Sequence, residues 1–407
     1  MREFMDLRFG MFIHWGPVSL RGTEIGWSRD KQLPKADYDS LYKEFDPVLF
    51  NADDWVKTAK DAGMKYLVIT ARHHDGFCLW PTKYTTYNIS NTPFKKDVVG
   101  ALQKACIKQG IKFCIYYSIL DWWHPDYPLH SAHNNPKPDP NANMGKYVTY
   151  MKNQLKELIL QYNPYMLWFD GGWESPWTEE MGKDMYAYLK KLKPSIIINN
   201  RLGKEIAAVE NKKIDVTKMI GDYDTPEQTV GRANMETPWE SCFTICNQWS
   251  WKPNDKMKPL RECLRILSQT SGGNGNLLLN VGPMPDGRIE ARQVKRLKEI
   301  GDWLKINGSA VYKTMGGPYP PNASFATTRK GNKIFVHIIN TDTAAISLKN
   351  IPGVTIVKAY TMDGTPVKLN TASTSFELQL PAALKDGIEY IIVLETNQNT
   401  EQLALIN

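Results

Sequence analysis

The chain has 407 residues, of which 42% are hydrophobic and 23% are charged. This balance is typical of globular proteins, and the length allows one large α/β domain with a smaller second domain. The net charge of +7 is spread along the chain, and no basic run indicates a nucleic-acid or membrane-surface site. No apolar stretch is long enough to span a membrane.

Short apolar runs alternate with helical patterns from residue 10 to about residue 307. Such nearly continuous hydrophobic runs are typical of parallel strands that are covered on both faces. The candidate strands are residues 10–16, 65–71, 111–118, 165–170, 195–200, 216–221, 242–247 and 276–282. Eight strands alternating with helices predict a (β/α)8-like barrel, irregular over 200–260, where no convincing helix is found. A doubly wound parallel sheet is the alternative architecture.

The pattern changes after residue 314. The segment "MGGPYPPNAS" (315–324) is rich in Gly and Pro and predicts a linker, and alternating apolar runs follow it. Asp363-Gly364 between two of these runs is a hairpin signal. We therefore expect a catalytic barrel over 1–314, an antiparallel β-sandwich over 315–396, and a frayed tail over 397–407.

Polar and aromatic residues gather at the carboxyl ends of the first five predicted strands, which read "FIHWG", "ITARHHDGF", "YYSILDWWH", "LWFDGGW" and "INNRLG". In a barrel these ends converge on one mouth, where catalytic groups collect. The residues that would meet there are His14, His73, His74, Tyr117, Asp121, Trp168, Asp170 and Arg201. Aromatic faces pack on sugar rings while planar polar groups bind sugar hydroxyls, so the mixture indicates a carbohydrate site.

Asp170 ends the apolar run "YMLWFD", and a carboxylate against an apolar wall costs several kcal/mol unless it has a partner or a use. Gly171 and Gly172 follow it and let a ligand approach closely. Hydrolysis of a glycoside needs two carboxylates, and Asp170 is a candidate for the nucleophile. The alternative is that Asp170 caps the next helix or accepts a hydrogen bond from a backbone amide.

Six segments in order, "FGMFIHWG", "ARHHDGF", "YYS", "LWFDG", "WESC" and "GNLLLNVGPMPDG", together resemble the retaining α-L-fucosidases, glycoside hydrolase family 29. They extend over residues 9–287, and the predicted β-sandwich follows them. The resemblance implies an exo-acting glycosidase that releases terminal α-L-fucose from oligosaccharides or glycoconjugates by double displacement.

The resemblance also implies roles for individual residues. Asp170 matches the nucleophile, and Glu227 in "GDYDTPEQ" matches the acid/base, with Glu240, Glu236 and, more distantly, Glu210 as alternatives. Residues expected to bind the substrate are His14, Glu24, Trp27, His73, His74, Tyr117, Trp168, Arg201 and Glu240.

We expect no cofactor and no metal, because the histidines show neither H-x-H nor H-E-x-x-H spacing. A metal-dependent barrel hydrolase and a catalytically inactive fucose-binding protein are the alternative functions. The expected partner is a fucosylated oligosaccharide or a glycoprotein glycan, without nucleic acid or a membrane span, and an oligomer is compatible with the sequence. We expect a periplasmic or secreted protein whose export signal lies outside these residues, with a cytoplasmic location as the alternative.

Overall fold

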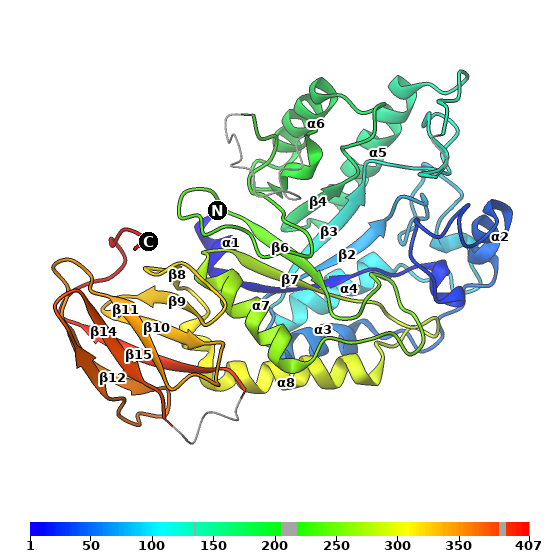
Figure 1. Cartoon of the computed structure of the whole chain (residues 1–407). Coiled ribbons are helices and arrows are strands. Elements are labelled where there is room, and N and C mark those ends of the chain that lie inside the picture. The colour runs from blue at the N-terminus through cyan, green and yellow to red at the C-terminus, as the bar shows by residue number, and fades with distance from the viewer. Residues whose placement is uncertain (134–135, 205–217, 382–387, 407) are drawn as a thin grey trace.

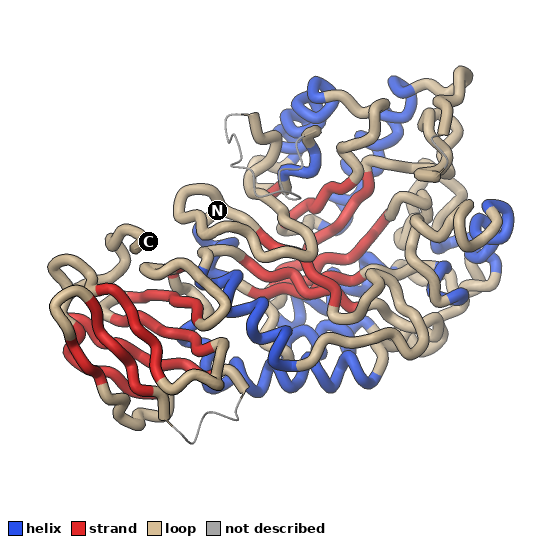
Figure 2. The backbone as a smooth tube through the Cα atoms, viewed as in Figure 1, coloured by secondary structure: helices blue, strands red, loops and turns tan. Residues whose placement is uncertain are grey.

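The computed structural model describes residues 1–133, 136–204, 218–381 and 388–406. Within these ranges a curled parallel sheet of seven strands, in the order β5-β4-β3-β2-β1-β7-β6, forms the larger part of the molecule. Helices cover the outside of this sheet, and antiparallel strands form a separate body beside it (Figures 1 and 2). The parallel strands are β1 (Phe9–Ile13), β2 (Tyr66–Arg72), β3 (Lys112–Ser118), β4 (Met166–Asp170), β5 (Ile197–Ile198), β6 (Glu240–Thr244) and β7 (Asn276–Val281).

Side-chain caps fix where several helices begin. Asn51 accepts hydrogen bonds from the Asp53 and Asp54 amides, and Asp97 accepts one from the Gly100 amide. The α-helices are α1 (Arg2–Leu7), α2 (Lys35–Ser40), α3 (Ala52–Asp61), α4 (Val98–Gln109), α5 (Met144–Tyr162), α6 (Glu179–Leu192), α7 (Leu260–Gly272) and α8 (Ala291–Asn307). The described 3₁₀ turns are Pro17–Arg21, Leu41–Lys43, Ile89–Asn91, Asn200–Leu202 and Gly308–Ala310.

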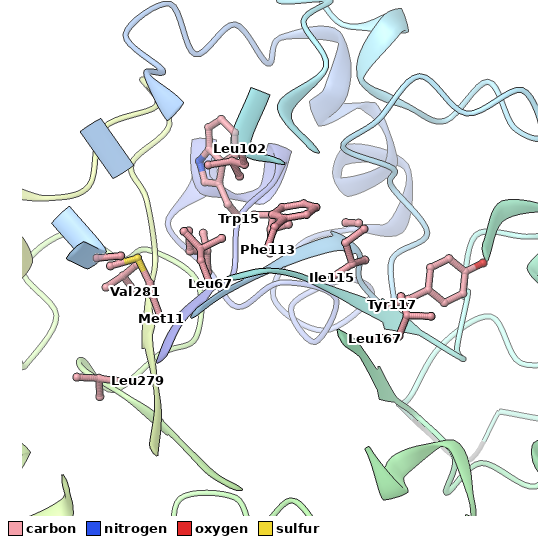
Figure 3. Close-up of a cluster of buried hydrophobic side chains, with 14 of the residues drawn as sticks. Met11, Trp15, Leu67, Leu102, Phe113, Ile115, Tyr117, Leu167, Leu279 and Val281 are labelled. Carbon is pink, nitrogen blue, oxygen red and sulfur yellow. The ribbon is translucent and has the colours of Figure 1, made fainter. Parts of the chain in front are cut away.

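Alternate residues of each parallel strand point to opposite faces of the curled sheet. One set packs against the surrounding helices, and Figure 3 shows part of it, with Leu67, Ile115 and Leu167 on the same side. The other set fills the interior of the barrel with Phe12, Tyr66, Val68, Cys114, Tyr116, Met166, Trp168, Cys242 and Leu278. Phe4 of α1 closes the bottom of this interior, where its ring lies 5.9 Å from that of Tyr66 and 4.8 Å from that of Tyr223.

The predicted strand at 216–221 is wrong where the structure describes it, because residues 218–221 form no strand; residues 216–217 lie outside the described residues. The extended segment 222–228 instead fills the gap between β5 and β6. Parallel bridges join Tyr223 to Asn199, Asp224 to Trp239 and Glu227 to Cys242. Gly221 begins this segment at φ 149°, and a Cβ there would lie 2.5 Å from the Asn199 carbonyl oxygen, which explains the glycine.

The C-terminal strands form two antiparallel sheets, β12-β15-β10-β9-β8 and β11-β14-β13, which share one buried core. Their bounds are β8 (Met315–Gly316), β9 (Phe325–Lys330), β10 (Lys333–Ile338), β11 (Ala345–Lys349), β12 (Ile356–Thr361), β13 (Leu369–Thr371), β14 (Ser375–Gln379) and β15 (Tyr390–Thr396). This sandwich packs against α7 and α8 of the barrel (Figure 1). The Ser268 hydroxyl of α7 and the imidazole of His337 of β10 meet at 2.9 Å in that interface.

The expectation that residues 397–407 fray is wrong for 397–406; residue 407 lies outside the described residues. The Thr400 amide donates to the Gly331 carbonyl at 2.7 Å, and the Arg329 guanidinium donates to the Leu403 carbonyl at 2.6 Å. Leu403 and Ile406 pack against the sandwich core. Apolar burial and backbone hydrogen bonds therefore hold the tail in place.

Candidate active site

A cavity opens at the carboxyl ends of the barrel strands. Its lining combines aromatic rings with histidines, an arginine and two carboxylates. The lining residues are Phe12, His14, Trp27, His73, Tyr116, Trp168, Asp170, Trp173, Arg201, Glu227, Cys242 and Trp249. Seven of the predicted site residues lie together here: His14, Trp27, His73, Trp168, Asp170, Arg201 and Glu227.

Asp170 is fixed at the last position of β4, and its side chain is 11% exposed. Arg201 Nη1 lies 2.9 Å from Asp170 Oδ1, and the Tyr116 hydroxyl donates to Oδ2 at 3.0 Å. His74 Nε2 is 3.6 Å from Oδ2. The guanidinium and the hydroxyl each contact one carboxylate oxygen, so the Asp170 side chain is held in a fixed position in the cavity wall.

Glu227 contacts the same arginine as Asp170. Arg201 Nη1 is 2.8 Å from Glu227 Oε2, and the Glu227 side chain is 38% exposed. Because one nitrogen contacts both carboxylates, the two contacting oxygens are separated by less than about 6 Å, close enough to face one sugar carbon from two sides.

Arg201 is itself held in position. Its Nε donates to the Thr225 hydroxyl at 3.0 Å and its Nη2 to the Thr225 carbonyl at 3.1 Å. Burial alone would lower the pKa of the guanidinium, but the carboxylates of Asp170 and Glu227 outweigh it, and the pKa is raised. Arg201 is therefore a permanent cation between the two carboxylates.

The alternative glutamates do not reach Asp170. Glu236 is exposed and lines a separate groove beside the C-terminal tail. Glu240 is fully buried inside the barrel, where Trp168 Nε1 donates to its Oε1 at 3.0 Å. Glu240 therefore contacts the far edge of Trp168, which lines the cavity, and is not among the lining residues; this corrects its predicted contact with substrate. Glu210 lies outside the described residues.

The three predicted histidines are buried and are neutral near pH 7; His14 and His73 line the cavity, whereas His74 is not among the lining residues and lies beside Asp170. Burial lowers the pKa of His14 and of His74 to about 3, and it lowers the pKa of His73 well below its ordinary value. His14 Nδ1 lies 2.6 Å from Asn280 Oδ1, and His74 Nδ1 lies 2.7 Å from the Ser118 hydroxyl. An amide oxygen only accepts, so Asn280 assigns the His14 proton to Nδ1 and leaves Nε2 to accept from a ligand hydroxyl.

His73 and Tyr116 continue the wall of the cavity. Their rings stack at 5.3 Å, and Tyr116 stacks on Trp168 at 5.5 Å. His73 Nδ1 is buried without a hydrogen-bond partner among the described residues. The result is an aromatic wall with polar edges, which suits a ligand that has an apolar face and several hydroxyls.

The prediction of Tyr117 at the site is wrong, because Tyr117 and Tyr116 point to opposite faces of β3. Tyr117 packs in the outer core (Figure 3), and its hydroxyl donates to Gln154 Oε1 at 2.8 Å. Tyr116 pairs with Trp168 in the strand register and shares its inward face. Tyr116 is therefore the tyrosine of the cavity.

Glu24 does not line the cavity, in contrast to the predicted contact with substrate. Its carboxylate accepts hydrogen bonds from the Trp249 amide at 3.0 Å and the Ser250 amide at 3.1 Å. Burial raises its pKa, and these hydrogen bonds partly oppose the rise. Glu24 thus positions the loop that carries Trp249, whose ring lies 4.8 Å from that of His14.

Tyr116, Trp173, Cys242 and Trp249 are cavity residues that the sequence reasoning did not assign. Trp173 follows Asp170 by three positions, and its ring stacks with that of Trp27 at 6.4 Å. The sequence held a signal for both tryptophans: Trp173 stands in the strand-end segment "LWFDGGW", and Trp249 follows the predicted strand 242–247 by two positions.

No cluster of three or more His, Cys, Asp or Glu side chains suited to a metal ion occurs in the described ranges. Among the helices that the structure describes, none has the length and apolar character needed to cross a membrane.

A parallel barrel that holds two carboxylates around one arginine in an aromatic cavity defines a class, the barrel hydrolases that act on sugars. Comparison with known proteins agrees. The family model described as alpha-L-fucosidase matches residues 1–309. Bovine tissue alpha-L-fucosidase is 32% identical over 337 residues, which are 76% of this chain and 68% of that protein.

Solved structures are similar over nearly the whole chain. Alpha-L-fucosidase isoenzyme 1 from Paenibacillus thiaminolyticus superposes with a TM-score of 0.86 at 32% identity, covering 98% of this chain and 100% of that one. A trapped covalent intermediate of a family 29 alpha-L-fucosidase from Bacteroides thetaiotaomicron gives a TM-score of 0.87 at 28% identity, covering 97% and 95%. The chain belongs to the alpha-L-fucosidase family.

Proposed function

We propose that this protein hydrolyses terminal α-L-fucosides with retention of configuration, with Asp170 as the nucleophile and Glu227 as the acid/base. The observation that carries this assignment is the single nitrogen, Arg201 Nη1, that contacts both carboxylates in the aromatic cavity. The expected substrate is a fucosylated oligosaccharide or glycan.

In the first step a carboxylate oxygen of Asp170 attacks the anomeric carbon and forms a glycosyl ester. The bond from that carbon to the leaving oxygen breaks as Glu227 delivers a proton to this oxygen. In the second step Glu227 takes a proton from water, the water oxygen attacks the same carbon, and the ester bond to Asp170 breaks.

The surroundings of the two carboxylates suit these different tasks. Asp170 is buried and held by Arg201 and Tyr116, which fixes the position of the nucleophile. Glu227 is more exposed and can exchange its proton with water between steps. The neutral imidazoles of His14 and His74 accept hydrogen bonds from sugar hydroxyls, and the indoles of Trp168 and Trp249 pack against the apolar side of the sugar.

The experiment uses 4-nitrophenyl α-L-fucoside with azide as an external nucleophile. Asp170→Gly should lose nearly all turnover, and azide should then give β-L-fucosyl azide, since it replaces the nucleophile in one displacement. Glu227→Ala should form the ester with this activated leaving group, and azide should then release α-L-fucosyl azide.

Glu236→Ala is the matched control, because Glu236 is an exposed glutamate outside the cavity, and it should keep wild-type turnover. An inactive Glu236→Ala variant together with an active Glu227→Ala variant would show that the acid/base is misassigned. Wild-type protein that binds fucose but releases no nitrophenol would instead be a sugar-binding protein without catalysis.

A further inference from the structure

A second hollow lies on the same face of the barrel as the cavity. It is an open groove of about 580 Å³, lined by residues 82–86, Asn88 and Asn91 of the segment that follows β2 and by residues 123–125 of the segment that follows β3. Both segments leave the carboxyl ends of parallel strands, so this groove opens on the catalytic face. None of the residues assigned above to catalysis lines it.

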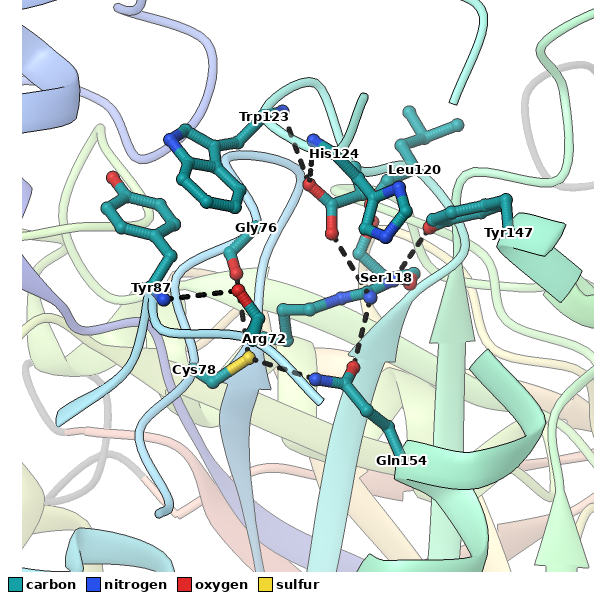
Figure 4. Close-up of polar contacts among 12 residues, drawn as sticks. Arg72, Gly76, Cys78, Tyr87, Ser118, Leu120, Trp123, His124, Tyr147 and Gln154 are labelled. Atoms are coloured by element: carbon teal, nitrogen blue, oxygen red, sulfur yellow. Dashed lines mark hydrogen bonds and ion pairs between the residues drawn. The ribbon is translucent and has the colours of Figure 1, made fainter. Parts of the chain in front are cut away.

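Aromatic rings form part of the groove surface. The Tyr84 side chain lies in the groove and the residue is 45% exposed. Trp123 also lines the groove, and its indole stacks on Tyr87 at 4.7 Å with 15° between the planes; Figure 4 shows the two rings side by side. An exposed aromatic ring beside threonine hydroxyls matches the alternating C–H faces and hydroxyl edges of a pyranose.

The wall of the groove is already ordered. The Asn88 side chain accepts from the Ser90 amide at 2.8 Å and donates to the Thr85 carbonyl at 2.6 Å and the Thr82 carbonyl at 3.2 Å. The Cys78 amide donates to the Tyr87 carbonyl at 3.1 Å. Because little chain entropy remains to be lost, even a weakly held sugar can gain net affinity here.

One short loop separates the groove from the catalytic cavity. Trp122, buried in that loop, lies 5.4 Å from the Trp27 ring and 5.3 Å from the His74 ring on the cavity side. The next residue, Trp123, faces the groove. A glycan that left the cavity past Trp27 would have to cross this loop to reach the groove.

A buried ion pair fixes the loop between the two sites. Asp121 Oδ1 accepts from the Trp123 amide at 3.2 Å and the His124 amide at 2.9 Å, and Asp121 Oδ2 lies 3.2 Å from Arg72 Nη1. Arg72 also donates to the Ser118 carbonyl, next to the hydroxyl that contacts His74. The groove and the cavity thus share one rigid support.

We propose that this groove is a subsite for the neutral sugar units of a fucosylated oligosaccharide that lie beyond the unit carrying the fucose. The inference rests on the proposed function, because the fucosyl unit must occupy the cavity for the rest of the glycan to reach the groove. It makes the enzyme one that prefers extended glycans over small fucosides.

The test compares kcat/KM for 4-nitrophenyl α-L-fucoside with kcat/KM for fucosylated glycans of at least four sugars, in α1-2, α1-3, α1-4 and α1-6 linkage. The ratio of interest is kcat/KM for the glycan that the wild type cleaves best, divided by kcat/KM for the nitrophenyl fucoside. Tyr84→Ala should lower this ratio roughly three- to tenfold, mainly by raising KM for the glycan. Thr86→Arg, which fills the groove from an exposed position, should lower the same ratio.

Ile107→Ala is the control, since Ile107 is a 69% exposed apolar residue on α4 outside both sites, and its ratio should equal that of the wild type. The groove proposal is overturned if the ratio is unchanged in both groove variants, or if the wild type cleaves the nitrophenyl fucoside but none of the glycans. Wild-type protein that cleaves neither kind of substrate would instead refute the proposed function, and the groove proposal with it.

Discussion

Replacing Glu240 by glutamine should make the stability of the protein less dependent on pH. Glu240 is fully buried in the barrel, where it accepts hydrogen bonds from the Tyr66 hydroxyl and from Trp168 Nε1. Burial raises its pKa from 4.5 to about 7, and hydrogen bonds with Tyr66, Trp168 and Tyr223 partly oppose the rise. In the unfolded chain the carboxyl returns to its ordinary value.

The sign follows from proton counting. Between pH 4.5 and 7 the folded protein keeps a proton on Glu240 that the unfolded chain has released. The stability from this group is therefore fully present below pH 4.5 and decreases as the pH rises toward 7. From pH 5 to pH 8 the linkage amounts to about 2–3 kcal/mol of unfolding free energy, and glutamine abolishes it. Glutamine has only one acceptor oxygen for the donors around it, so the variant should be less stable at pH 5 by about 1–3 kcal/mol.

The assay is urea unfolding followed by tryptophan fluorescence at pH 5 and pH 8, with Glu236→Gln as an exposed control that should match the wild type at both. The stability gap between wild type and Glu240→Gln should shrink or change sign at pH 8. A gap of the same size at the two pH values would refute the assignment of Glu240 as a buried carboxyl that titrates near neutrality.

Three further predictions concern the cavity and the tail. Tyr116→Phe removes the hydroxyl that donates to Asp170 and should lower kcat/KM roughly ten- to a hundredfold, while Tyr117→Phe should stay within about threefold; equal losses would mean that the faces of β3 are misassigned. Arg201→Met leaves two carboxylates without their shared cation and should cost roughly a hundred- to a thousandfold in kcat/KM, so near-normal kinetics would contradict the bridging role. Deletion of residues 397–407 removes the contacts to Gly331 and Arg329 and should lower the melting temperature by about 2–4 °C in a thermal scan, whereas an unchanged melting temperature would favour a frayed tail.

The regular part of the barrel could be predicted from the sequence because its signals are local. Continuous apolar runs located β1–β4 and β7 to within about three residues at each end, and the rule that strand ends converge brought His14, Asp170 and Arg201 to one cavity. The prediction of Tyr117 at the site was wrong because Tyr116 and Tyr117 are adjacent tyrosines, and the apolar pattern is the same whichever of them faces inward. Only the pairing of β3 with β4 decides which one faces inward.

The role of Glu240 could not be read from its own neighbourhood. "WESC" places a carboxylate at the start of an apolar run, which describes a cavity residue and a buried one equally well. What decides the matter is that Tyr66, distant in sequence, and Trp168 enclose this carboxylate. Such enclosure depends on tertiary packing and leaves no periodic signal in the sequence.

The two carboxylates of the site lie on different kinds of backbone, Asp170 on a regular strand and Glu227 on an irregular segment. This explains why Asp170 was easier to locate from the sequence. Asp170 ends a regular strand, where the Asn199 side chain bonds both the Phe169 amide at 2.7 Å and the Phe169 carbonyl at 2.9 Å. Glu227 lies on the irregular segment that fills the gap in the barrel, and Gln228 beside it has φ 52°. That backbone conformation costs a non-glycine residue on the order of 1 kcal/mol or more. The hydrogen bond that the Gln228 amide donates to the Cys242 carbonyl at 2.9 Å helps to hold it. A strained, irregular segment has no hydrophobic period, so the position of the proposed acid/base is set by hydrogen bonds to β6 that only the folded barrel supplies.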